Sequence, residues 1–189
     1  MKKIKILAII GSLRKHSYNR QLALYAQKMI GDRADFIILE YGDVPIFNED
    51  IEFPTPPSVA RVRDLVKSSD ALWIFTPEHN HFFPSALKNI IDWLSRPISE
   101  KEPDVLAGKL VTYSGASLSQ TGSIVAQDHL VSLISFLNMT IMNRPRVAVP
   151  WAHQQLDAEG YLALNSKSLT FLEKQVNAFL NFINMHQSK

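Results

Sequence analysis

Residues 71–97 read ALWIFTPEHNHFFPSALKNIIDWLSRP, and this stretch decides the fold prediction. It opens with Ala71–Thr76, a short apolar run typical of a strand that is buried on both faces of a sheet. A polar and aromatic loop follows, and Pro84 then begins a helical pattern, because proline is favoured at the first position of a helix. In an open α/β sheet, ligands bind in the crevice where a strand passes into a helix. We therefore expect this loop to be a binding loop.

The same alternation of strand and helix recurs along the chain, which indicates β-α-β units and a parallel sheet. It predicts an α/β fold: a flavodoxin-like doubly wound five-stranded parallel sheet with helices on both faces, formed by a single domain over residues 1–189. The predicted strands are Ile4–Ile10, Ala34–Glu40, Ala71–Thr76, Lys109–Ser114 and a fifth, split near Pro145 into Thr140–Met142 and Arg146–Val149. The predicted helices are Asn19–Ile30, Pro57–Ser69, Pro84–Ser95, Gly122–Leu137 and Ser166–His186.

Composition excludes several classes of protein. The net charge of +2 over 189 residues, with no basic stripe, does not indicate a nucleic-acid partner. There are no cysteines, so neither a disulfide nor a thiolate metal site is possible. His153 and Asp157 form a pair without further ligands, which is weak evidence for a metal, and we expect none. The apolar run after Lys2 and Lys3 is interrupted by Lys5 and is too short for a signal peptide or a membrane span. We expect a cytoplasmic protein with no membrane partner.

The loop after the first predicted strand, residues 11–19, is suited to bind a phosphate. The Ser12 and Ser17 hydroxyls, the Asn19 amide, backbone N–H groups and the amino end of the next helix can all point at one anion. Arg14 adds a guanidinium fork that suits phosphate oxygens. The glycine motif of dinucleotide-binding folds and the Walker lysine loop are both absent. Taken alone, Ser17 or Asn19 is read as a helix cap, whereas the loop as a whole favours a phosphate site.

Two further loops are predicted to hold a flat ring system. Residues 77–80 place backbone and amide groups where the heteroatom edge of a flavin needs hydrogen bonds. Residues 114–122 are small and polar, and their glycines permit close backbone approach from the opposite side. His79 and His81, each considered singly, are at least as well explained as exposed loop histidines. No nucleophile motif or catalytic triad emerges, so we assign no catalytic side chain.

Taken together, three segments resemble the NADPH-dependent FMN reductase family, which includes flavodoxin-like quinone, chromate and azo reductases. They are the first loop, the loop Asp43–Asp50 after the second strand, and Pro77–Asn80 with the run Leu87–Pro97 behind it. The resemblance implies that the first loop holds the FMN phosphate and that the other loops border its ring. The implied cofactor-binding residues are Ser12, Arg14, Ser17 and Asn19 for the phosphate, Pro77, Glu78, His79 and Asn80 beside the ring, and Ser114, Gly115 and Ser117 opposite them.

The chain departs from the family's usual pattern at three positions, with His79 in place of tyrosine and His81 and Ser85 in place of glycine. A histidine at position 79 removes a ring surface and adds a group that can titrate near neutral pH. A side chain at position 81 crowds the entrance to the ring. The departures leave FMN binding as the expectation and bear on substrate preference and FMN affinity.

The resemblance implies an FMN-dependent NAD(P)H oxidoreductase, with NADPH or NADH as co-substrate. Its acceptors would be quinones, azo dyes, chromate or flavins. Two substrates that use one flavin face in turn would give ping-pong kinetics. The family also implies a homodimer or homotetramer that completes the flavin pocket. The alternative is a flavin carrier or redox sensor with little turnover of its own, which crowding by His81 would favour.

Overall fold

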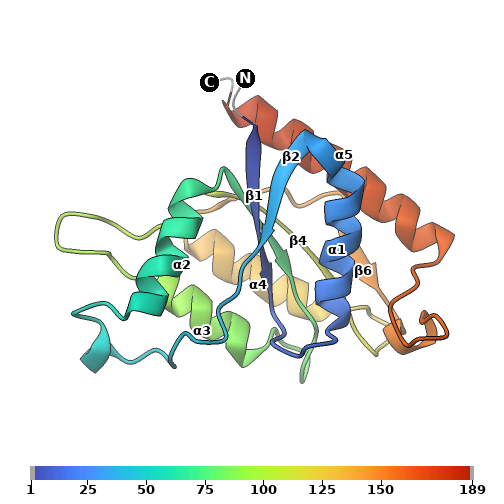
Figure 1. The fold of residues 1–189 in the computed structure, drawn as a ribbon, viewed down its shortest axis with the longest axis horizontal. Helices are drawn as coiled ribbons and strands as arrows, with labels where there is room; N and C mark the ends of the chain where they lie inside the picture. Colours follow the sequence, from blue (N-terminus) through green and yellow to red (C-terminus); the bar gives the residue numbers. More distant parts are fainter. Residues whose placement is uncertain (1–2, 188–189) are drawn as a thin grey trace.

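A parallel sheet runs through the centre of the structure, a computed structural model that describes residues 3–187 (Figure 1). The strand order is β2-β1-β3-β4-β5, and β6 also pairs with β4. Every pairing is parallel, so the predicted flavodoxin-like doubly wound fold is confirmed. Lys2 and the outermost ends of the predicted domain lie outside the described residues. The strands are β1 (Ile4–Ile10), β2 (Ala34–Ile38), β3 (Ala71–Phe75), β4 (Leu110–Ala116), β5 (Thr140–Ile141) and β6 (Val147–Val149).

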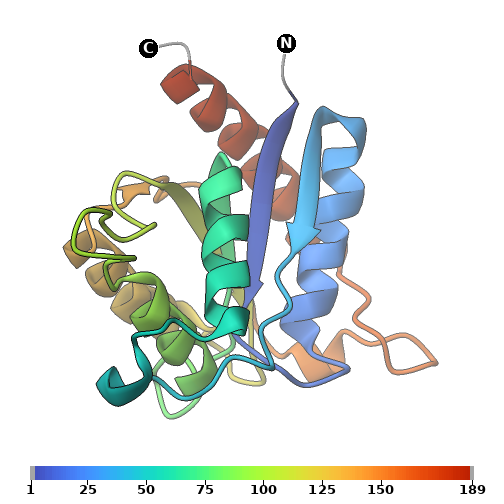
Figure 2. The same cartoon turned by 60° about the vertical axis from the view of Figure 1, so that its left-hand side comes forward.

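Helices cover both faces of the sheet, as Figures 1 and 2 show. Trp73 and Phe75 of β3 face the layer of α1 and α5, whereas Leu72 and Ile74 face the layer of α2, α3 and α4. Because both faces are covered, all of β3 is buried. The helices are α1 (Tyr18–Ile30), α2 (Pro57–Ser68), α3 (Ser85–Leu94), α4 (Ile124–Phe136) and α5 (Ser166–Gln187), and short 3₁₀ turns lie at Gly31–Arg33, Glu49–Ile51 and Ala152–Gln154.

The edge beside β4 is built from two strand fragments, as the predicted split near Pro145 requires. Val111 of β4 pairs with Ile141 of β5, and pairing resumes with Val147 of β6, so the residue-by-residue pairing is interrupted over residues 142–146. Pairing with β6 extends β4 as far as Ala116. The prediction that the fourth strand ends at residue 114 was therefore wrong, because its last residues find a partner in β6.

Three predicted helix starts were also displaced. Pro84 has an extended ψ of 154° and precedes α3, so it is the N-cap and not the first helical residue. Gly122 and Ser123 have φ angles of 61° and 78°, in the left-handed region, so α4 begins only at Ile124. At α1 the helix begins one residue early, at Tyr18. These shifts lengthen two of the loops singled out from the sequence.

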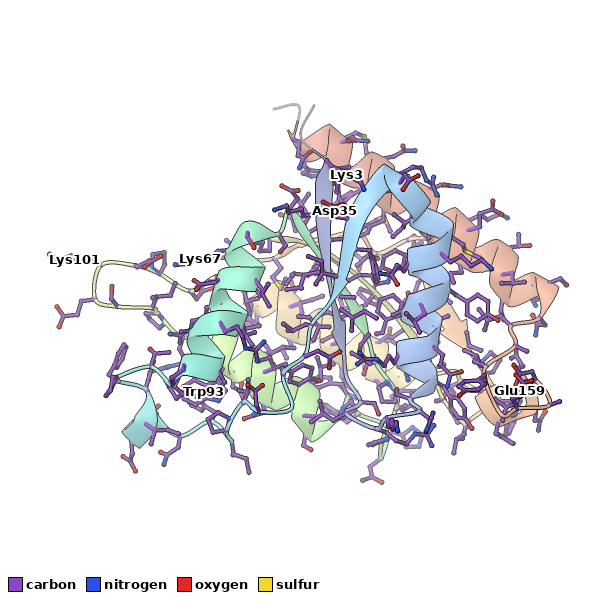
Figure 3. The ribbon with its side chains drawn as sticks, viewed as in Figure 1. Lys3, Asp35, Lys67, Trp93, Lys101 and Glu159 are labelled. Carbon is purple, nitrogen blue, oxygen red and sulfur yellow. The ribbon has the colours of Figure 1, made fainter. Side chains whose placement is uncertain are left out.

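The three loops gather at the carboxyl-terminal end of the sheet because the strands that precede them are parallel. Lys3 and Asp35 mark the opposite, amino-terminal end of the strands, where their side chains form an ion pair of 2.9 Å (Figure 3). The carboxyl ends of β1, β3 and β4 therefore meet away from this ion pair. Within residues 3–187, every helix is too short or too polar to cross a membrane.

Candidate functional site

The loops that follow β1, β3 and β4 surround a cavity of about 650 Å³. This volume lies within the range of pockets that bind small molecules and cofactors. All the predicted site residues line the cavity except Ser114 and Gly115. The lining residues are Ser12, Arg14, Ser17, Tyr18, Asn19, Pro77, Glu78, His79, Asn80, His81, Ala116, Ser117, Leu118 and Ser119.

The loop after β1 offers hydrogen-bond donors that the protein itself leaves unused. Among the described residues, no acceptor is found for the backbone N–H groups of Ser12, Leu13, Lys15 and His16. Arg14 is exposed, and its guanidinium lies over the Tyr18 ring, 4.9 Å from the ring centroid. Unpaired N–H groups beside a helix amino end, together with one cation, form an environment that favours an anion.

Two polar side chains of this loop have structural partners. The Ser17 hydroxyl accepts a hydrogen bond from the backbone N–H of Arg20 at 3.4 Å, as expected for the cap of α1. The Asn19 amide is buried and bonds both ways to the backbone of Ala116, with each N···O distance 2.9 Å. Asn19 thus fastens the first loop to the end of β4. Sequence reasoning did not foresee this bond, because its two partners lie 97 residues apart.

The loop after β3 is held in a tight turn by its own backbone. His79 and Phe82 exchange two backbone hydrogen bonds of 2.9 Å, and Asn80 and His81 between them have φ angles of 52° and 59°. The His81 side chain is 80% exposed, so it stands at the mouth of the cavity and does not fill it. Residues 77–80, which lead into this turn and begin it, line the cavity.

Ser114 and Gly115 lie in the protein interior, and the structure does not bring them to the cavity. The Ser114 hydroxyl accepts a hydrogen bond from the Trp73 indole at 2.9 Å and donates one to Gln175 at 2.7 Å. A Cβ at Gly115 would lie 1.9 Å from the Ser123 hydroxyl oxygen, so this glycine admits the segment that precedes α4. Ser114 is held by these two interior bonds, and the extension of β4 carries Gly115 into the sheet.

The segment after β3 and α3 that reaches the cavity from the opposite side begins at Ala116, two residues later than predicted. Ala116, Ser117, Leu118 and Ser119 line the cavity, and the hydroxyls of Ser117 and Ser119 are joined by a hydrogen bond of 2.8 Å. Residues 116–119 fall within the predicted loop 114–122, and Tyr18 falls within the predicted loop 11–19. The lining residues that were not among the predicted cofactor-binding residues are Tyr18, His81, Ala116, Leu118 and Ser119.

These residues fit FMN. The unused donors and Arg14 lie on the side of the first loop, where a phosphate would be held. Residues 77–80 and residues 116–119 border the rest of the cavity, where a flat ring needs close approach from both sides. Within residues 3–187, no group of three or more histidine, aspartate or glutamate side chains could hold a metal ion.

Comparison with known proteins identifies relatives over nearly the whole chain. The family model for NADPH-dependent FMN reductase matches residues 4–154, which include all three loops around the cavity. An NAD(P)H-dependent FMN reductase of Pseudomonas aeruginosa is 35% identical over 176 residues, which is 93% of this chain and 92% of that protein. A quinone reductase of Pseudomonas putida is 33% identical over 184 residues, covering 97% of this chain and 96% of that protein.

A solved structure is similar as well. The flavoenzyme NAD(P)H:(acceptor) oxidoreductase from Paracoccus denitrificans has a TM-score of 0.86 and is 32% identical, with 97% of this chain and 98% of that chain covered. The agreement in sequence and in fold therefore extends from β1 to α5.

Proposed function

The chain belongs to the NADPH-dependent FMN reductase family, and from this premise we propose how its own residues serve an FMN-dependent oxidoreductase. The activity is that of an NAD(P)H-dependent FMN or quinone reductase, with FMN as cofactor and a reduced nicotinamide as co-substrate. Bound FMN supplies the redox chemistry by accepting hydride from the nicotinamide and passing electrons on. The tasks left to the protein are to bind the cofactor and the substrates, to orient them and to shield the flavin ring.

The first loop is the proposed phosphate site. Arg14 supplies the charge, and the unused backbone N–H groups of residues 12, 13, 15 and 16 supply directional donors. Ser12 adds a hydroxyl, while Ser17 and Asn19 shape the loop through the bonds that they make to the protein. The observation that carries this proposal is the convergence of three separate loops on one cavity.

The ring is proposed to lie between the second and third loops. Pro77, Glu78, His79 and Asn80 would border one side, and Ser117 with its neighbours the other. His81 stands exposed at the mouth, which leaves room for a substrate to reach the ring and favours turnover over a carrier or sensor role. We propose ping-pong kinetics because the cavity offers one site for both substrates to use in turn.

We propose quinones as the first acceptors to examine, because quinone reductases are among the relatives. Azo dyes, chromate and free flavins are the further acceptors to compare. We also propose that residues 1–189 form one domain, that the protein acts in the cytoplasm, and that it assembles as a homodimer or homotetramer.

The function is tested by adding FMN to the purified protein and then supplying NADPH or NADH with a quinone. We expect flavin fluorescence to be quenched on binding and the nicotinamide to be oxidised promptly. Parallel double-reciprocal plots over several quinone concentrations would support the ping-pong order, and intersecting plots would exclude it. A protein that binds FMN but stays oxidised would be a carrier or a sensor. A protein that rejects FMN would refute both roles.

A further inference from the structure

Glu78 lines the cavity, yet its carboxylate is occupied by the protein. Its Oε2 accepts hydrogen bonds from the backbone N–H groups of Val125 and Ala126, at 3.1 and 3.2 Å. Its Oε1 accepts a third from the Thr121 hydroxyl at 3.3 Å. The side chain is only 6% exposed. A carboxylate this well engaged is directed at the third loop, so its contribution to a ligand is indirect.

Two of the three partners of Glu78, Val125 and Ala126, lie in the first turn of α4, which lacks the usual cap. Ser123 stands at the N-cap position, but it makes no side-chain hydrogen bond to the helix backbone. Its hydroxyl instead accepts from the Gln127 amide at 3.0 Å. Glu78 therefore supplies from another loop the acceptor that satisfies the first N–H groups of α4. Its negative charge also suits the positive end of the helix dipole.

The bond to α4 fixes one end of the tight turn after β3. Glu78 immediately precedes His79, where the turn begins, and the turn contains two residues in the left-handed region. His81 approaches Glu78 with 3.6 Å between its Nδ1 and Oε1, but it is exposed and adds little to the anchor. With the Asn19–Ala116 bonds, which join the first loop to β4, the Glu78 bonds link all three loops of the cavity.

We propose that Glu78 is a positioning residue for the flavin site: it holds the backbone of residues 77–80 at a fixed distance from the third loop. This inference rests on the proposed function, because the spacing that Glu78 sets is the slot for the ring. The acceptor oxygens matter more than the charge, since two of the three partners are backbone N–H groups. Glutamine keeps an acceptor at the same reach, whereas aspartate keeps the charge but is shorter by one carbon–carbon bond, about 1.5 Å.

The experiment compares Glu78→Ala, Glu78→Asp and Glu78→Gln with the wild-type chain. The measurements are the dissociation constant for FMN, the visible absorption spectrum of bound FMN and kcat with a quinone. We expect Glu78→Ala and Glu78→Asp to weaken FMN binding by about tenfold or more, because the N–H groups of α4 lose their acceptor. We expect Glu78→Gln to stay within about threefold of wild type and to keep its flavin spectrum. If Glu78→Ala fails to fold, Glu78→Asp provides the same comparison.

Asn165→Ala is the matched control, because Asn165 caps α5 through the backbone N–H of Ser168 at 2.9 Å and does not line the cavity. It should lower thermal stability and leave FMN affinity unchanged. Full FMN affinity and an unchanged spectrum in both Glu78→Ala and Glu78→Asp would overturn the inference. So would equal losses in Glu78→Gln and Glu78→Ala, or an equal loss in the control. A wild-type chain that does not bind FMN would instead refute the proposed function.

Discussion

The loop after β1 and the carboxyl end of β4 border the same cavity but use their polar groups in opposite ways. The first loop leaves backbone N–H groups without acceptors and exposes Arg14, of which one guanidinium nitrogen donates to the His16 carbonyl oxygen. At the end of β4, Ser114 is bonded to Trp73 and Gln175, and the space beside Gly115 is filled by Ser123. Groups that a ligand can satisfy remain open, whereas groups that hold the loops in place are already satisfied. From this comparison we expect a polar residue near the cavity to contact the ligand where the fold leaves its polar groups free.

Gly115→Ala should cause the largest loss of stability, because Gly115 lies in the protein interior with no room for a side chain. Its new Cβ would lie 1.9 Å from the Ser123 hydroxyl oxygen and 2.2 Å from the Thr76 backbone oxygen. Overpacking of this kind costs about 3 kcal/mol, and here one of the opposing atoms belongs to the backbone. Urea unfolding measures the loss. Gly160→Ala is the control for a glycine with open space around it, although its φ of 82° carries a strain of its own. A stable Gly115→Ala protein with weakened FMN binding would place Gly115 on the ligand side instead.

Asn19→Ala should have the next largest effect, and it should act first on stability. The change leaves the buried N–H and C=O groups of Ala116 without their partner. Unsatisfied buried groups cost about 1–3 kcal/mol, so the free energy of unfolding should fall by that amount. FMN affinity should fall as well, because the first and third loops lose their link.

The unfolding measurement distinguishes this role from direct phosphate binding. If Asn19→Ala weakens FMN binding and keeps the full free energy of unfolding, Asn19 contacts the ligand directly, as we propose for Arg14. Asn165→Ala serves again as the control, because it removes an asparagine that bonds the backbone far from the cavity.

Arg14→Ala should have the opposite effect: it should weaken FMN binding and leave the free energy of unfolding nearly unchanged. Loss of one charged donor to a phosphate should weaken FMN binding by about tenfold, since hydrogen bonds to charged groups contribute about 1.5–3 kcal/mol. The free energy of unfolding should change by no more than about 0.5 kcal/mol, because Arg14 is an exposed loop residue. Lys15→Ala is the matched control: Lys15 carries the same charge next in the chain but does not line the cavity. Equal effects of the two changes would mean that general charge, and not the Arg14 contact, attracts the phosphate.

The same difference, between polar groups with and without a hydrogen-bond partner in the protein, separates the features that the sequence predicts from those that it does not. The sequence predicts β1 and β3 directly, because a strand that is buried on both faces is a nearly continuous run of apolar residues. Gly115 looks like a loop residue, and its pairing with Ala148 of β6 draws it into the sheet, while Ser114 at the predicted end of the strand is turned inward by its bond to Gln175. The bonds of Asn19 and Glu78 span 97 and 47 residues, so no spacing rule can reveal them. The phosphate role of the first loop stays a prediction, and the free backbone N–H groups support it because their availability depends on the local loop alone.

The second loop offers the smallest and most specific test, at His81. Its φ of 59° lies in the region that glycine adopts readily, so His81→Gly fits the backbone of the turn without moving it. The exposed imidazole stands at the mouth, where it limits the approach of a large acceptor more than that of a small one. We expect the KM for a bulky naphthoquinone to fall by about threefold and the KM for benzoquinone to change little, since differences in contact alone have modest effects.

His81→Asn is the control for this change, because asparagine tolerates the left-handed region and keeps a side chain at the mouth. It should give intermediate KM values and the same FMN affinity as wild type. An equal fall in KM for both quinones would show that His81 acts on the ring itself. In that case the second loop would join the first loop on the ligand-binding side of the comparison.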